Sequence, residues 1–253
     1  MSQIVWLSFG IFMTNLLMGR FACLTALLGS LLITGCATKF EKQAFNNEAS
    51  AGIKKIAVQQ WNDLDEYGVR VLNHPGASFG LVGALVMAAD TASKTKKVND
   101  LLDPKNTKLT TDFYAKALPG LRQAGYEVVA VPVKRGAKPV DTKEAVRAMK
   151  GQDAFLLLTF EAGYLAAGAS TAYYPFVAMT AELNDSKSQA VLYKEAYHYG
   201  YNSGNKDVVH IEAAADCKFT DIDNLVANID KTRSCLAASV DILVKQMVAD
   251  LKK

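Results

Sequence analysis

The residues best placed to do chemistry in this chain are a serine between glycines and a histidine far downstream. Residues 76–80 (GASFG) match the G-x-S-x-G pattern of a nucleophile elbow, a sharp strand-to-helix turn that exposes a serine hydroxyl. His210 follows acids such as Asp207, so the chain order of a hydrolase triad can be written. However, Pro75 stands where the elbow strand should still pair, and Ser78 can equally cap the next helix. A serine hydrolase using Ser78 is therefore kept as the alternative.

Metal and cofactor chemistry finds no support in the sequence. The three histidines, His74, His198 and His210, are scattered and lack ligand spacing. The chain contains no C-x-x-C, H-E-x-x-H or acidic calcium loop, and no G-x-G-x-x-G or Walker phosphate loop. We therefore expect no metal ion, no cofactor and no enzymatic activity.

The first residues of the chain have the plan of a secretory leader. Arg20 supplies a basic start, and the apolar run 21–32 that follows has the length of a leader core. The apolar residues before Met18 carry no positive charge and would leave Arg20 inside the membrane, which is costly. We expect residues 1–35 to be a cleaved signal peptide whose true start is Met18. The alternative is an uncleaved membrane anchor.

The end of this leader leads to a cysteine. Residues 32–36 (LITGC) resemble the cleavage box of bacterial lipoproteins: a branched apolar residue, then small residues, then cysteine. The resemblance implies that Cys36 becomes the first mature residue and carries lipid, which attaches the chain to a membrane. Ala37 in place of Asp implies the outer membrane, with the protein facing the periplasm. Several acyl chains on one cysteine suffice for stable anchoring.

Composition limits the remaining function classes. Removing the leader leaves 218 of the 253 residues, a length suited to one domain, and half of the whole chain is apolar. Arg20 is the only charge removed, so 27 basic face 25 acidic residues and the mature charge is +2. This near-neutral balance argues against nucleic-acid binding.

The order of apolar patterns predicts one α/β (α+β) domain, a mixed β-sheet covered by helices. We expect a lipidated tether at 36–51 and a periplasmic domain at 52–253. The first two strands should form a hairpin, and a second hairpin should turn at about residue 185. The expected strands cover 53–59, 67–72, 126–133, 154–160, 176–183 and 190–201; the expected helices cover 79–97, 110–124, 141–150 and 236–251.

Four stretches carry a likeness to known proteins: 53–58 (IKKIAV), 125–129 (GYEVV), 153–157 (DAFLL) and 191–193 (VLY). With this order of elements, the domain resembles the curli-secretion lipoprotein and the lipoprotein activators of penicillin-binding proteins. The resemblance implies an accessory or binding module with a protein partner in the envelope. The apolar helix after the second strand departs from that pattern.

That helix carries small residues at four-residue spacing. Such a stripe lets another backbone approach closely. We expect it to pack inside its own domain; the alternatives are pairing with a second copy, which would give a homo-oligomer, and dipping into the membrane interface. The stripe consists of Gly76, Gly80, Ala84, Ala88 and Ala92.

Tyrosines gather on one face of the expected strand 190–201. Tyrosine is favoured at interfaces, so the face is a candidate binding surface. The alternative is a face covered by a helix, with the hydroxyls at its rim. The tyrosines are Tyr193, Tyr197, Tyr199 and Tyr201.

Cys217 and Cys235 are an even pair in an oxidising compartment, which predicts a disulfide. One uninterrupted helix over 221–253 would place Cys235 roughly 21 Å from the start of the helix. Cys217 can retrace only about 14 Å of that distance, so a long helix and the bridge nearly exclude each other. We therefore expect the helix to break between residues 228 and 232, with Asp230 or Thr232 as the cap.

Overall fold

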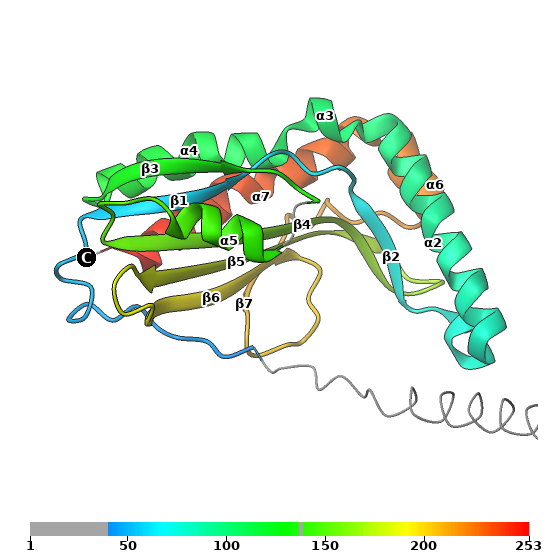
Figure 1. The fold of residues 1–253 in the computed structure, drawn as a ribbon. Coiled ribbons are helices and arrows are strands. Elements are labelled where there is room, and N and C mark those ends of the chain that lie inside the picture. Colours follow the sequence, from blue (N-terminus) through cyan, green and yellow to red (C-terminus); the bar gives the residue numbers. More distant parts are fainter. Residues whose placement is uncertain (1–39, 137–138, 253) are drawn as a thin grey trace, which may run out of the picture. The chain divides into compact units, whose positions relative to one another are not determined.

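A computed structural model describes residues 40–136 and 139–252; Cys36 and the leader lie outside them. From Glu41 onward the chain forms one compact unit. Within the described residues this unit is a seven-stranded mixed β-sheet covered by helices (Figure 1). The α/β fold predicted from the sequence is confirmed.

The elements follow the predicted order, with four short additions: η2, α3, β7 and α6. The strands are β1 (Lys55–Trp61), β2 (Gly68–Asn73), β3 (Glu127–Val133), β4 (Ala154–Gly168), β5 (Tyr173–Asp185), β6 (Val191–Gly200) and β7 (Val209–Ile211). The helices are η2 (Pro75–Phe79), α2 (Gly80–Leu102), α3 (Pro104–Thr107), α4 (Leu109–Gln123), α5 (Pro139–Arg147), α6 (Ile222–Ala227) and α7 (Ile229–Asp250).

The sheet has the strand order β3-β1-β4-β5-β6-β7, and β2 pairs with β4 off this path. The start of β4 pairs in parallel with β1, while its second half pairs in parallel with β2. The predicted hairpin of β1 and β2 is therefore wrong: the two strands line up along β4 instead of pairing with each other. The predicted hairpin of β5 and β6 is confirmed as an antiparallel pair.

Side chains alternate between the two faces of the sheet, as strand geometry requires. On β1, Ile56 and Val58 belong to the main core, which α4 and α7 cover, while Ala57 faces a smaller cluster under α5. The main core includes the apolar residues that recur at four-residue spacing along α4: Leu109, Phe113, Ala117 and Leu121. Helices thus cover the sheet on both faces (Figure 1).

The segment 41–51, predicted to be part of a tether, belongs to the folded unit. Gln43 bonds to Lys194 of β6 in both directions, through backbone N–H and carbonyl groups at 2.8 and 2.9 Å. Lys42 forms an ion pair with Glu195 at 2.9 Å, and Ser50 is completely buried. Strand pairing with a distant residue is invisible to local composition, which is why these polar residues resembled a linker.

The predicted disulfide joins Cys217 and Cys235, and the C-terminal helix is broken as this bridge requires. α6 ends at Ala227 and α7 begins at Ile229, within one residue of the predicted break. The predicted cap is wrong, since Asn228 occupies the N-cap position and makes no side-chain cap bond. The Thr232 hydroxyl instead donates to the Leu225 carbonyl at 2.8 Å, which ties the two helices together.

Replacing both cysteines by serine should lower the free energy of unfolding by about 3 kcal/mol, because the bridge closes a loop of some 18 residues in the unfolded chain. Chemical unfolding of Cys217→Ser/Cys235→Ser beside the parent protein measures this loss. Peptide mapping is the control for pairing: an unreduced tryptic digest should hold peptide 207–218 linked to 234–245. Recovery of both peptides free, without reduction, would contradict the bridge.

Candidate interaction surface

A cluster of apolar side chains projects from one end of the domain, formed by η2 and the first half of α2. Five of its large side chains are exposed by 56 to 78% of their surface. No charged residue occurs between His74 and Asp90. We call this projection, residues 75–89, the apolar tip; its five large exposed side chains are Phe79, Leu81, Val82, Leu85 and Val86.

The second half of α2 holds the apolar tip in place by bonding to β2. The Thr95 hydroxyl accepts from the backbone N–H of Val69 at 3.0 Å. The Asn99 side chain accepts from the N–H of Tyr67 at 2.7 Å and donates to the Tyr67 carbonyl at 2.9 Å. These bonds attach the second half of α2, and the first turns of the helix extend past the end of β2 (Figure 1).

Within the tip, η2 packs against the first turns of α2 through two glycines. A Cβ atom on Gly83 would lie only 1.8 Å from the Gly76 carbonyl oxygen, and one on Gly76 would lie 2.6 Å from the Gly83 oxygen. Both glycines are buried at this contact. The two backbones can therefore touch only because neither residue has a side chain.

A group of polar side chains, which we call the polar collar, marks the base of the tip. Asp90 lies 2.6 Å from the ammonium of Lys94 and 3.3 Å from Nε2 of His74. Burial opposes the charge on Lys94, but bonding to Asp90 and to Tyr173 outweighs it and raises the pKa of the ammonium. Lys94 therefore stays charged where the apolar surface ends.

The predicted small-residue stripe does not pack inside the domain. Gly80, Ala84, Ala88 and Ala92 are all exposed, and Gly76 alone among the five is buried. The close contact uses Gly83 instead, which lies outside the four-residue series. The expectation of internal packing is wrong because the contacting segment, η2, is short and meets only one turn of α2.

The residues of the predicted hydrolase triad are not brought together. Ser78 is exposed in η2, beyond the end of β2, whereas His210 is on β7. Four strand spacings separate β2 from β7, roughly 19 Å. The nearby His74 is already engaged, since its Nδ1 accepts from the Gly76 N–H and its Nε2 faces Asp90.

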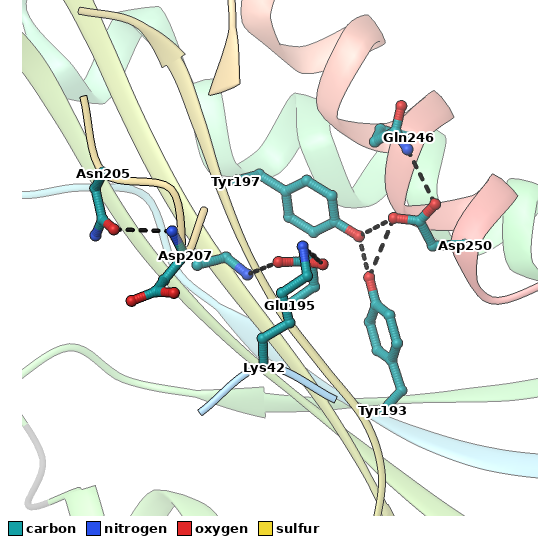
Figure 2. Close-up of polar contacts among 9 residues, drawn as sticks. Lys42, Tyr193, Glu195, Tyr197, Asn205, Asp207, Gln246 and Asp250 are labelled. Carbon is teal, nitrogen blue, oxygen red and sulfur yellow. Dashed lines mark hydrogen bonds and ion pairs between the residues drawn. The ribbon is translucent and has the colours of Figure 1, made fainter. Parts of the chain in front are cut away.

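The tyrosine face of β6 is covered by α7, which leaves no open binding surface there. Tyr193, Tyr197 and Tyr199 are exposed by 3% or less. The Tyr197 hydroxyl donates to the Asp250 carboxylate at 2.6 Å and also contacts the Tyr193 hydroxyl (Figure 2). Burial, then the neighbouring Tyr193 and Asp250, raise the pKa of Tyr197. The interface interpretation is therefore wrong for these three residues.

Tyr201, the fourth tyrosine, remains partly exposed beyond the end of β6. It lines a shallow cleft of about 360 Å³ together with Tyr174 and His210. His210 pairs in register with His198 of the neighbouring strand. In the part of the chain that the structure describes, no three acidic, histidine or cysteine side chains gather into a metal site.

Comparisons with known proteins give distant structural likenesses only. No family model and no curated protein matches the chain. Among solved structures, it is similar to lipoprotein GNA1162 from Neisseria meningitidis (19% identity over 72% of this chain and 98% of that one, TM-score 0.25). It is also similar to protein XCC0632 from Xanthomonas campestris (12% identity over 78% of this chain and 85% of that one, TM-score 0.32). A third similar structure is the PelC dodecamer from Paraburkholderia phytofirmans (16% identity over 78% of this chain and 94% of that one, TM-score 0.27). These TM-scores are low.

The exposed apolar surface of the tip is the feature that sequence reasoning missed. Leu81, Leu85, Val82 and Val86 flank the small-residue stripe in the sequence, and only the stripe was singled out. The absence of charge from 75 to 89, followed by charged residues at Asp90, Lys94, Lys96 and Lys97, was the signal of a helix only half engaged with its domain.

Gly83→Ala should destabilise the tip, because the new methyl group would overlap the Gly76 carbonyl and overpacking typically costs about 1–3 kcal/mol. Ala84→Leu is the matched control: it adds a larger side chain one residue further along, where the helix is exposed. Thermal unfolding of both variants in detergent checks this. Equal melting temperatures for Gly83→Ala and the parent would show that the glycine contact does not form.

Stability should fall as the pH drops below about 6.5, the ordinary pKa of histidine. Burial, and then the charge of His210, lower the pKa of His198, while Glu161 opposes the shift only in part. The unfolded chain therefore takes up a proton before the folded one does, and stability present at neutral pH is lost on acidification.

Urea unfolding at about pH 7.5 and about pH 5.5 measures this loss, which His198→Gln should reduce. Both values lie above the range where Asp153 and Asp185 protonate, since backbone N–H donors lower the pKa of both carboxyls. An unchanged pH dependence in His198→Gln would exclude His198 as the cause.

Proposed function

We propose that this chain is a lipid-anchored accessory protein of the bacterial cell envelope that acts by binding and not by catalysis. It is held to the outer membrane through Cys36 and faces the periplasm. The observation that carries the binding role is the apolar tip, where five large side chains stand more than half exposed at the end of a rigid support. Exposed apolar clusters of this kind mark surfaces that meet another apolar partner.

The polar chemistry of the described residues supports binding over catalysis. Ser78 lies beyond the end of β2, four strand spacings from the strand that carries His210, and His74 has both ring nitrogens engaged. The buried tyrosines and Asp250 bond to one another inside the domain. The apolar tip itself presents no ionisable group.

The segment that would connect the lipid on Cys36 to the folded unit is short. Gln43 is already paired with β6, so this fixed point is only seven positions from Cys36. Even at full extension, seven residue steps reach about 24 Å. A lipid on Cys36 would therefore keep the domain close to the membrane surface.

Cys36→Ser should abolish lipid attachment and leave the chain unprocessed or released into the periplasm. Metabolic labelling with a fatty-acid probe, followed by separation of membrane and soluble fractions, measures both effects. Cys23→Ser is the matched control, because Cys23 lies inside the expected leader and should label like the parent. Equal labelling of the Cys36→Ser and parent proteins would overturn the anchor.

A further inference from the structure

We propose that the apolar tip inserts into the hydrocarbon of a single membrane leaflet and rests there beside the lipid anchor. The inference rests on the proposed envelope function and names the partner of the tip, the acyl chains of the lipid bilayer. Three features of the described residues carry it: the length of the tip, the width of its apolar surface and the position of its charges.

The length of the tip matches one leaflet and not a whole bilayer. The ten residues Gly80–Ala89 rise roughly 15 Å as an α-helix, which is half of a hydrocarbon core about 30 Å thick. The stretch Pro75–Leu102 is long and apolar enough by composition to span a membrane, and only 11% of its apolar window is buried. Its second half cannot enter, however, because Thr95 and Asn99 bond it to β2.

The apolar surface is wider than one partner helix would cover. At about 100° per residue, the exposed side chains from Ala84 through Leu81 and Leu85 to Val86 sweep roughly 200° of the helix surface. A helix-to-helix seam uses an arc of about 100° or less. The remaining side of the helix is covered by η2. Acyl chains surround an inserted helix on every open side, so they fit this surface better than a second copy does.

The uncharged section of the helix ends, and charged side chains begin, at the depth where the lipid headgroups would lie. The polar collar closes the apolar section, with the Lys94 ammonium bonded to Asp90 at 2.6 Å. Lys96 and Lys97 follow; both are exposed, and they pair with Asp100 and with Asp223 of α6. Lysines at this level can meet lipid phosphates while the tip below them stays free of charge, as at the ends of membrane-embedded helices.

The start of the folded unit runs along the sheet toward the end that carries the tip. Gln43 pairs antiparallel to β6, and β6 runs in the same direction as β4 and β2. Traced back from Gln43 to Glu41, the chain therefore heads for the end of the sheet from which the tip projects. In Figure 1 the start of the folded unit and the tip both lie along the lower side of the view.

The test places a fluorophore on the tip of the full, processed protein. Val82→Cys is labelled with an environment-sensitive maleimide and reconstituted into phosphatidylethanolamine–phosphatidylglycerol vesicles, with a nitroxide quencher on the acyl chains. Lys96→Cys is the matched control on the polar half of the same helix. Cys217 and Cys235 are bonded to each other, so a second label on the peptide holding Cys36 would report failure of the anchor separately.

Insertion predicts that the Val82 probe shifts its emission to the blue and loses most of its intensity to the acyl-chain nitroxide, while aqueous iodide quenches only the Lys96 probe. Iodide quenching of both probes would place the tip in water and overturn the proposal. A blue shift without nitroxide quenching, together with disulfide-linked Val82→Cys dimers, would assign the tip to a second copy and overturn it equally.

Discussion

The close approach of two glycines, Gly68 on β2 and Gly163 on β4, is the constraint on which the projecting end of the domain depends. A Cβ atom on Gly163 would lie 1.8 Å from the Gly68 carbonyl oxygen, and its φ of +158° is extended backbone. With no side chain there, β2 can pair along the second half of β4 while β1 pairs along the first. That pairing gives α2 a strand to bond to, and so decides where the apolar tip points.

Features that depend on local pattern were predictable. The four-residue spacing of α4, the polar turn between β5 and β6, and the broken C-terminal helix all follow from neighbours in the sequence. The Cys217–Cys235 bridge joined this group because a chain-length argument linked it to the helix break. In each case the interacting residues are at most 18 positions apart, so the local order of residues carries the information.

Features that depend on a distant partner were not predictable. Gln43 looks like part of a linker until Lys194, far along the chain, is seen to pair with it. β1 and β2 looked like a hairpin because nothing in their own residues indicates that both pair with β4. The stripe through Ala84 was assigned to the interior because an apolar helix ordinarily packs on its own domain. Only the bonds of Thr95 and Asn99 show that this helix is half engaged.

The last turn of α7 has a consequence for when the domain can close. Asp250 accepts the Tyr197 hydroxyl, and the Leu251 carbonyl accepts that of Tyr126 at 2.8 Å, so the final turn bonds to two buried tyrosines. A chain synthesised from its N-terminus lacks both acceptors until residues 250 and 251 have been made. The hydroxyls of Tyr126 and Tyr197 therefore gain these partners only in the last step of folding.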